Sequence, residues 1–394
     1  MSAFALMRGQ LAWFRERGWD VTLACSPDRQ AALAVEREGI AFHAIPTQRA
    51  ISLLADLRTL RLWVSFLRSE GPDAVNVGTP KAGLLGGLAA WALRVPKRLY
   101  VCRGLRLEGS SGPLALVLWV MERLSTAVAT DVVVVSRSLA DELLARHLVN
   151  ARKAWLIGEG SSNGVDAATI AARAAAIDSA DLRAEHGIPA AAVTVGFVGR
   201  LAPDKGVDTL LAALRQIEVA CDVHLVVIGA VEDPGVEARL ATLGDRVHVL
   251  GWTSDLWAKW PILDVLCLPT RREGFPNVVL EAAAAGIPTV TTRATGAVDS
   301  VVDGVTGFLV NIDDSSSLAR ALTRLATDHD LRQQMGTRAR ERAFDSFSPQ
   351  RIWGGLEALL DGTYASPDLQ RLDRLPARDA RRGTRAASNR DGDA

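Results

Sequence analysis

The segment Arg271–Gly286, RREGFPNVVLEAAAAG, contains two glutamates eight positions apart in otherwise apolar surroundings. Glu273 lies in a loop, whereas Glu281 lies in a predicted helix of Val, Leu and Ala. A carboxylate on an apolar helix face is costly to bury unless a partner compensates its charge. The pattern therefore indicates either a solvated helix face or a carboxylate that binds a ligand.

This segment follows a predicted strand, residues 264–270, and Pro276-Asn277 opens the helix that Gly286 ends. Asn is a favourable N-cap, and Gly is a common C-terminal stop. In open parallel sheets, ligands bind at the carboxyl ends of the strands, where helix N-termini point. We therefore expect the backbone that opens this helix to face an anion. The residues concerned are Gly274, Phe275, Pro276, Asn277 and Val278.

The position of each glutamate suggests a role. Glu281, one turn into the helix, is placed to accept two hydrogen bonds from a vicinal diol, and Glu273 to hold a sugar hydroxyl.

A second segment, VGFVGRLAPDKG at residues 195–206, carries two cations. The predicted strand ends at Gly199, and Arg200 and Lys205 follow it five residues apart across a turn. The planar fork of Arg and the mobile charge of Lys together suit a diphosphate. Each segment alone could also be a set of solvated surface charges. Because both follow strands of one domain, they predict a nucleotide-sugar site.

The 394 residues suggest two or three domains. Two blocks alternate short β-branched runs with helical patterns, which is typical of parallel α/β sheets. We predict two doubly wound, Rossmann-like domains facing a cleft, residues 1–162 and 163–347. A helix at 348–364 follows, and residues 365–394, rich in Arg, Asp, Ala and Ser, are expected to be a disordered tail.

The beginning of the chain departs from this pattern. Residues 2–20 have a helical pattern and a strand follows them, so the first strand of the doubly wound domain is missing. One interpretation is that Met1 is an internal methionine and that the native protein starts upstream of it.

Composition excludes several classes of protein. The 45 basic and 45 acidic residues argue against a dedicated nucleic-acid binder. Residues 1–160 nevertheless hold 20 Lys and Arg against 14 Asp and Glu, which favours an anionic partner such as a phospholipid surface.

Four widely separated cysteines argue against a zinc site or a disulfide framework, and indicate a reducing cytosol. The longest apolar run, Pro113–Met121, has nine residues, short of the roughly 20 of a spanning helix, and no signal-peptide pattern is present.

Three stretches, GRLAPDKG, REGFPNVVLEAAAAGIPTV and VVDGVTGFLV, resemble the donor domain of retaining glycosyltransferase family 4, which has the GT-B fold. The resemblance covers about residues 10–360. It implies that Glu273 binds the donor sugar, Glu281 the ribose, and Arg200 and Lys205 the diphosphate. It also implies that no metal or other cofactor is required, because the leaving diphosphate takes the acceptor proton. In addition, SSNGVD at 161–166 is similar to the family's entry into the donor domain, and the helix at 348–364 is expected to cross back to the first domain.

Residues 77–109, VGTPKAGLLGGLAAWALRVPKRLYVCRGLRLEG, are similar to the bacterial branch that extends polyprenyl-diphosphate-linked sugars or builds capsule and exopolysaccharide. The resemblance allows Lys81 to meet an acceptor phosphate. Many family members carry a histidine where this chain has Arg103, and the catalytic role is carried over to Arg103. The family's glycine-rich loop after the first strand is represented here only by a remnant near Ser2.

The sequence thus predicts a retaining hexosyltransferase that uses a UDP- or GDP-sugar and a lipid-diphosphate-linked glycan acceptor. We expect it to be cytoplasmic and peripherally associated with the inner face of the membrane. The segment 49–71 carries Arg49, Arg58, Arg61 and Arg68 among Leu, Ile, Trp and Phe. It is either a basic membrane-surface helix or an ordinary helix packed on the first sheet.

Three alternatives were weighed. A GT-B epimerase would need acid and base groups around the sugar, and no such cluster is evident. A nucleotide-binding scaffold without activity is disfavoured by the complete set of charged residues. A dinucleotide-dependent oxidoreductase is excluded because no G-x-G-x-x-G follows a strand.

Overall fold

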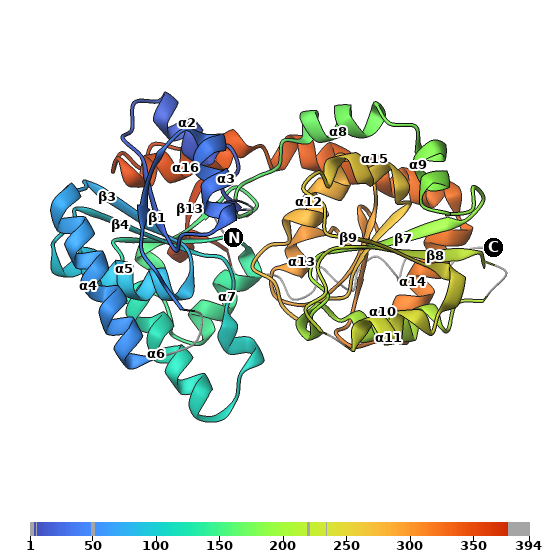
Figure 1. Cartoon of the computed structure of the whole chain (residues 1–394), viewed down its shortest axis with the longest axis horizontal. Coiled ribbons are helices and arrows are strands. Elements are labelled where there is room, and N and C mark those ends of the chain that lie inside the picture. Colours follow the sequence, from blue (N-terminus) through green and yellow to red (C-terminus); the bar gives the residue numbers. More distant parts are fainter. Residues whose placement is uncertain (1–3, 5, 49–51, 219–220, 234, 377–394) are drawn as a thin grey trace.

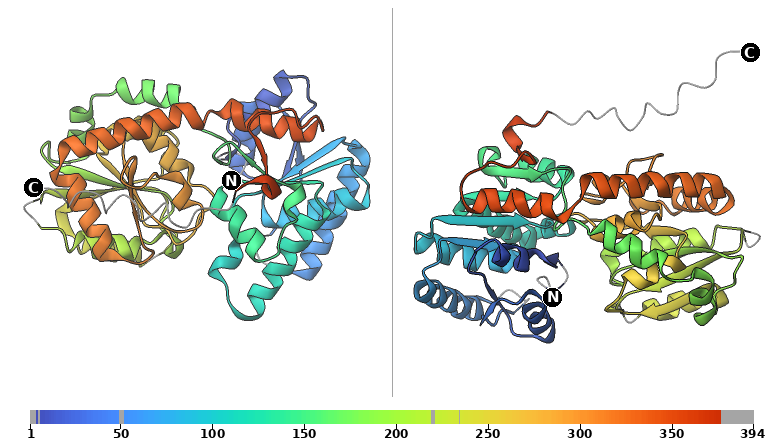
Figure 2. Two further views of the ribbon diagram at one scale, coloured as in Figure 1. Left: turned by 180° about the vertical axis from the view of Figure 1, so that it is seen from behind. Right: turned by 90° about the horizontal axis from the view of Figure 1, so that it is seen from above.

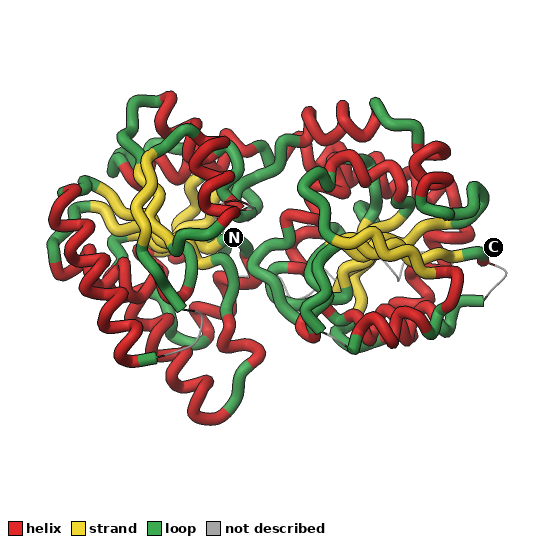
Figure 3. Tube along the Cα trace, in the orientation of Figure 1, coloured by secondary structure: helices red, strands yellow, loops and turns green. Residues whose placement is uncertain are grey.

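A computed structural model of the chain describes residues 4, 6–48, 52–218, 221–233 and 235–376 (Figure 1). Two α/β domains lie side by side, and in each of them helices cover both faces of the strands (Figures 1 and 3). The N-terminal domain also contains the last described elements of the chain, so its sheet combines strands from both ends of the sequence.

The strands of the N-terminal domain form two sheets. Five strands are ordered β13-β6-β5-β4-β3, and β1 pairs in parallel with β2 as a separate pair. All four residues of β5 are buried, as expected for a strand covered on both faces. The strands are β1 (Thr22–Cys25), β2 (Ala41–Ala44), β3 (Ala74–Val77), β4 (Lys97–Cys102), β5 (Asp131–Val134) and β6 (Ala154–Ile157).

Helix α4 joins the two sheets of this domain. Phe66 of α4 stacks on His43 of β2, with ring centroids 4.2 Å apart. On α5, Gly86 lies close to Trp63 of α4 and Val77 of β3. The helices are α2 (Gln10–Glu16), α3 (Arg29–Glu38), α4 (Leu53–Glu70), α5 (Pro80–Ala92), η1 (Arg106–Gly109), α6 (Gly112–Val128), α7 (Arg137–Ala145) and η2 (Ala151–Lys153).

Helix α5 contains the glycines that the sequence places after Thr79. The Thr79 hydroxyl accepts a hydrogen bond from Ala82 N, and Pro80 occupies the first turn, where its missing N–H costs nothing. A Cβ at Gly83 would lie 2.6 Å from the Tyr100 ring on β4. This glycine is therefore explained by the close packing of α5 on the sheet.

The C-terminal domain has one six-stranded parallel sheet, ordered β12-β11-β10-β7-β8-β9. Its strands are β7 (Val193–Val198), β8 (Val223–Ile228), β9 (Val247–Gly251), β10 (Val265–Leu268), β11 (Thr289–Thr292) and β12 (Gly307–Val310). Its helices are α8 (Ala167–Ala175), α9 (Ser179–Glu185), η3 (Pro203–Lys205), α10 (Val207–Leu214), α11 (Val236–Ala241), η5 (Gly244–Arg246), η6 (Trp257–Ile262), α12 (Asn277–Ala284), α13 (Ala297–Ser300), α14 (Ser315–Thr327) and α15 (His329–Ser346).

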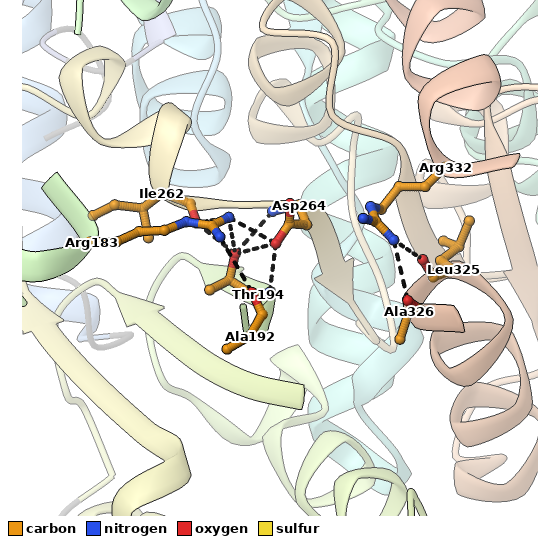
Figure 4. Close-up of polar contacts among 8 residues, drawn as sticks. All are labelled: Arg183, Ala192, Thr194, Ile262, Asp264, Leu325, Ala326 and Arg332. Carbon is orange, nitrogen blue, oxygen red and sulfur yellow. Dashed lines mark hydrogen bonds and ion pairs between the residues drawn. The ribbon is translucent and has the colours of Figure 1, made fainter. Parts of the chain in front are cut away.

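Buried polar contacts hold this domain together away from the carboxyl ends of its strands (Figure 4). Arg183 of α9 donates to Asp264 Oδ2 at 2.8 Å, and the same oxygen accepts from Thr194 N at 2.7 Å. These bonds tie α9 to β7 and to the turn before β10. Arg332 of α15 donates to the carbonyl oxygens of Leu325 and Ala326, which closes the end of α14.

The chain crosses between the domains at two adjacent points. Val165 N, at the entry to the C-terminal domain, donates to Phe347 O at its exit, at 2.8 Å. Just beyond the exit, Trp353 Nε1 donates to Asn163 Oδ1 at 2.8 Å. Helix α16 (Pro349–Leu360) then packs on α2, β4 and β6 of the N-terminal domain (Figure 2).

The prediction of a disordered tail from residue 365 is wrong for residues 365–376. Strand β13 (Leu369–Arg371) pairs antiparallel with β6, and η7 (Leu372–Arg374) follows it. Backbone hydrogen bonds and the burial of Leu372 order a segment whose composition is poor in apolar residues. Residues 377–394 lie outside the described residues.

The described chain has helical residues before β1, as the sequence pattern indicates. Among the described strands, β1 and β3 are each paired on one side, with β2 and β4 respectively, and not with each other. The glycine-rich remnant near Ser2 and the cation at Arg49 lie outside the described residues.

Candidate active site

The loop between β10 and α12 carries the predicted sugar ligand. Glu273 N donates to Thr295 O at 2.9 Å, which fixes the loop against the segment after β11. Helix α12 begins at Asn277, and the residue before it, Pro276, has extended backbone. Asn277 is therefore the first helical residue, and the prediction that it caps the helix is wrong. Its side-chain oxygen lies 3.5 Å from Ser161 Oγ instead.

Glu273 and Lys205 form an ion pair. Lys205 Nζ donates to Glu273 Oε1 at 2.5 Å, and each side chain is only about 15% exposed. Lys205 ends the short helix η3 after β7, and Gly206 follows it in a left-handed conformation, φ 69°. A Cβ at Gly206 would lie 1.9 Å from Pro269 O, so only glycine lets the two loops approach. The structure thus brings together two residues predicted from separate segments.

Arg200 has a different partner. Its guanidinium donates to Glu232, in the segment that follows β8, and both side chains are about 40% exposed. Gly199, the last residue before it, donates through its backbone to Ile228 O at 2.9 Å. Arg200 and Lys205 therefore lie after the same strand, but separate carboxylates hold them in this structure.

Glu281 lies on α12 in dense surroundings. The residue keeps partial exposure, but burial raises the pKa of its carboxyl to about 7, and the charge of Arg8 lowers it. Arg8 stacks over the Trp257 ring at 4.4 Å, and its carbonyl accepts from Asn163 Nδ2 at 2.9 Å. Arg8 therefore extends from the N-terminal segment to η6 of the other domain, from where its charge acts on Glu281. No local sequence pattern marks this arginine, so it could not be predicted as part of the site.

On the opposite domain, Arg103 follows β4. Its guanidinium lies against Gly78, where a Cβ would sit 1.6 Å from Nη1. Its Nε and Nη2 atoms are buried and have no hydrogen-bond partner among the described residues. Burial lowers the pKa of Arg103 to about 10. Arg103 is therefore a partly exposed arginine with two covered nitrogens, and it forms no ion pair with a carboxylate of the described chain.

Backbone of the two domains meets beside Arg103. A Cβ at Gly274 would lie 2.1 Å from Arg103 O and 3.0 Å from Gly104 N. A Cβ at Gly296 would lie 2.3 Å from Gly274 O. The loop that carries Glu273 is thus packed so closely that glycine is needed at Gly274 and Gly296.

A second interdomain contact joins α7 to α13. Asp299 Oδ2 accepts from Ser138 N at 2.8 Å and from Ser138 Oγ at 2.6 Å. Gly296 N donates to the same hydroxyl at 2.7 Å. These residues carry no recognisable motif, and only their long-range arrangement reveals the contact.

Other candidate residues are placed less directly. Phe275 is buried and its ring packs against Phe347, with centroids 5.6 Å apart, so only its backbone can face a ligand. Val278 is partly buried next to it. Lys81 donates to Asp56 at 2.5 Å, which binds its ammonium group to α4. The facing segments thus bring together an ammonium–carboxylate pair, a helix N-terminus and a partly exposed carboxyl on one domain with a partly exposed guanidinium on the other. This arrangement is suited to a hydroxyl-rich, anionic ligand.

Comparison with known proteins identifies the family. Residues 6–160 match the family described as "Glycosyl transferase 4-like domain", and residues 192–328 match "Glycosyl transferases group 1". The chain is 34% identical over 360 residues to the capsular polysaccharide biosynthesis glycosyltransferase CapM of Staphylococcus aureus, covering 90% of this chain and 93% of CapM. This chain is a family 4 glycosyltransferase. The predicted family and its bacterial capsule- and glycan-building branch are thereby confirmed.

Other similarities support the fold of this glycosyltransferase. It is 26% identical to the Escherichia coli UDP-Gal:α-D-GlcNAc-diphosphoundecaprenol α-1,3-galactosyltransferase, over 84% of this chain and 86% of that protein. The crystal structure of HepE from Anabaena with UDP-glucose superposes with a TM-score of 0.76 at 21% identity, over 91% of this chain and 96% of HepE. The predicted GT-B fold is confirmed. None of the helices in the described ranges is long and apolar enough to cross a membrane.

Proposed function

We propose that this glycosyltransferase moves a hexose, with retention of configuration, from a UDP-sugar to a polyprenyl-diphosphate-linked glycan in cell-surface polysaccharide synthesis. The observation that carries the proposal is the ion pair between Lys205 and Glu273 in the loops that precede α12. Glu281 lies on the same helix, one turn after its first residue. The donors named for the E. coli relative and for HepE favour UDP over GDP. The acceptor class follows from the diphosphoundecaprenol named for the E. coli relative.

In this proposal the donor replaces the partners that the charged residues have at rest. Lys205 moves from Glu273 to the diphosphate, and the released carboxylate accepts a hydrogen bond from a sugar hydroxyl. Arg200 exchanges Glu232 for the diphosphate in the same way. Because each charge keeps a partner before and after binding, the exchange avoids leaving an unpaired ion in the cleft.

The remaining donor contacts come from the backbone and from Glu281. The N-terminal turn of α12, with the loop residues Gly274–Pro276 before it, faces the phosphates with its partial positive charge. Glu281 accepts hydrogen bonds from the two ribose hydroxyls, which favours its ionised form over the protonated form that burial favours.

The transfer itself needs no protein nucleophile in this proposal. The bond between sugar C1 and the diphosphate oxygen breaks, and the acceptor hydroxyl oxygen forms the new bond to C1 on the same face. The hydroxyl proton passes to the departing diphosphate. The residues of the cleft position the two substrates and stabilise the charge that develops on the leaving group.

A lipid-linked acceptor requires a surface that meets the membrane, and we propose one on α4 and α6. Helix α6 exposes large apolar side chains along its length: Leu114, Leu116, Val117, Val120 and Leu124. The start of α4 exposes more, with Leu53 at 86% and Leu54 at 85%. Arg58 and Arg61 are exposed on the same helix, and α4, α5 and α6 lie side by side (Figure 1). This surface would place the protein on the inner, cytoplasmic face of an anionic membrane.

The function is tested with a panel of UDP- and GDP-hexoses, with and without a polyprenyl-diphosphate-linked glycan. We expect one donor to release nucleoside diphosphate, and only when the lipid acceptor is present. NMR of the product should show the same anomeric configuration at C1 as in the donor. Release without lipid would contradict the proposed acceptor. Nucleotide binding without any release would favour a scaffold instead.

The membrane surface is tested by flotation with phosphatidylglycerol vesicles. Leu116→Glu should lower the bound fraction about tenfold, because it removes one large apolar side chain from the interface. Val305→Glu, on an exposed apolar residue of the other domain, is the matched control. Equal flotation of both variants and the unaltered chain would contradict the surface.

A further inference from the structure

Arg103 has two donors for which the described residues provide no acceptor. Its Nε and Nη2 atoms each have less than 1 Å² of exposed surface and no hydrogen-bond partner among the described residues. The groups that favour its charge are Tyr100 and Cys102, and neither is a carboxylate. Covered N–H donors of a cation that lack an acceptor destabilise the fold, so their presence is explained best by an acceptor that a ligand supplies.

The unpaired atoms define the shape of the missing partner. Nε and Nη2 form one edge of the guanidinium, with two N–H groups pointing the same way. This edge makes two parallel hydrogen bonds to a phosphate or a carboxylate, a geometry that lysine cannot supply. The structure therefore specifies an oxyanion rather than a neutral hydroxyl.

The surroundings of Arg103 also favour an anion. Gly78, against which the guanidinium lies, precedes the N-terminal turn of α5 by two residues. The 13-residue helix directs its positive end to this place, and Lys81 contributes a further cation to the same turn, in contact with Asp56. Two independent observations, the unpaired guanidinium and the helix terminus, thus point to one ligand.

We propose that Arg103 binds a phosphate of the acceptor's lipid diphosphate. This inference rests on the proposed function and names the residue that recognises its acceptor. Every group of the site belongs to the N-terminal domain, whereas the cations expected to hold the donor diphosphate, Arg200 and Lys205, belong to the other domain. The guanidinium lies against Gly78, whereas the backbone of the same residue contacts Gly274, so the residue that binds the anion also borders the loop that carries Glu273. Since both nitrogens are covered in this arrangement, the acceptor binds only after the segments packed around the guanidinium move.

The test separates charge from geometry. Arg103→Gln removes the charge, and Arg103→Lys keeps the charge but loses the two-pronged edge. Arg106→Gln, an exposed arginine three residues further along, is the matched control. For each variant we would measure the KM of a diphosphate-linked acceptor and of the same sugar on an uncharged alkyl chain, and calorimetric binding of UDP and of geranyl diphosphate.

The expected result is a selective loss. Arg103→Gln should raise the KM of the diphosphate acceptor at least tenfold and weaken geranyl diphosphate equally. UDP affinity and the KM of the uncharged acceptor should stay within twofold of the unaltered chain. For Arg103→Lys, the KM of the diphosphate acceptor should lie between the values of the unaltered chain and of Arg103→Gln. Arg106→Gln should have the KM values and affinities of the unaltered chain.

Two outcomes would overturn the proposal. If Arg103→Gln weakened UDP binding but left geranyl diphosphate binding unchanged, the anion bound by Arg103 would belong to the donor. If the variant bound both ligands as the unaltered chain does, Arg103 would bind neither phosphate. Arg103-dependent binding of geranyl diphosphate by a chain that transfers no sugar would support the site while contradicting the proposed function, so the two failures are distinguishable. Thermal melting of each variant shows whether it is folded.

Discussion

The two domains differ in how the cations that face the other domain are paired. On the C-terminal domain, Lys205 and Arg200 are held by the carboxylates of Glu273 and Glu232. On the N-terminal domain, Arg103 has two covered nitrogens for which the described part of the chain offers no acceptor. Paired ions can exchange partners at small net cost, whereas an unpaired buried ion lowers stability until a ligand arrives. We therefore expect the cations of the C-terminal domain to exchange a carboxylate for the ligand, and Arg103 of the N-terminal domain to gain an acceptor that it lacks without ligand.

The largest effect is expected on the paired side. Glu273→Gln should lower turnover by roughly 10²- to 10³-fold, because it removes a contact with the reacting sugar and leaves Lys205 without its carboxylate. The measurement is the steady-state rate of nucleoside diphosphate release. Glu237→Gln, an exposed glutamate on α11, is the control. A Glu273→Gln variant that turns over at the rate of this control would contradict the assignment.

Glu281 is an intermediate case, since its side chain is only partly exposed, desolvation raises the pKa of its carboxyl to about 7, and the charge of Arg8, from the other domain, opposes that rise. Glu281→Gln should weaken UDP binding by roughly 10- to 100-fold through loss of charged hydrogen bonds to the ribose. Calorimetry across pH sharpens the result. Affinity of the unaltered chain should rise with pH through about 7 as the carboxyl ionises, and the variant should show no such rise. A flat profile for both would show that Glu281 does not contact the nucleotide.

The same residue predicts a stability trend of opposite sign. The folded pKa of Glu281, about 7, lies above its ordinary value of 4.5, so the folded state binds the proton more tightly. The free energy of unfolding of the unaltered chain should therefore fall, relative to Glu281→Gln, as pH rises from about 4.5 to 7. Urea denaturation at several pH values measures this difference, and parallel curves would contradict it.

Arg103 should show the cost of an unpaired charge directly. Arg103→Met should raise the free energy of unfolding by about 1–3 kcal/mol in the absence of ligand, because a buried cation without a partner is replaced by an apolar side chain. Arg200→Met, on the exposed and paired arginine, should change it by less than about 1 kcal/mol. Destabilisation by Arg103→Met would show that the protein itself satisfies this guanidinium.

The smallest effect is expected at the contact between the domains. Ser138→Ala removes hydrogen bonds to Asp299 and Gly296, worth about 1 kcal/mol together, and should lower kcat about twofold to fivefold through weaker domain closure. Ser110→Ala, whose hydroxyl bonds to Arg106 O within its own loop, is the control. Identical kcat values in the two variants would show that the hydrogen bonds of Ser138 do not contribute to domain closure.

Local patterns explain what the sequence could predict. Alternating apolar runs located the strands, and the two charged segments placed Glu273 and Lys205 at the carboxyl ends of β10 and β7, where they meet. Contacts over long sequence separations were not predictable in this way. Arg8 reaches Glu281 only because the domains face each other, and the lack of a partner for Arg103 becomes visible only when all its neighbours are known. Strand β13 was missed because backbone pairing with β6, rather than composition, orders it.

The adjacent crossings at Asn163 and Phe347 have an evolutionary consequence. The C-terminal domain is inserted into a domain whose sequence resumes at α16 and β13, and its two ends lie within one hydrogen bond of each other. Recombination at these two points would exchange the inserted domain, to which we assign the donor, while leaving the sheet of the other domain intact. An exchange at only one of them would separate β13 from its partner strand β6. Replacement of the inserted domain as a unit therefore preserves the pairing of β13 with β6, which joining two halves end to end does not.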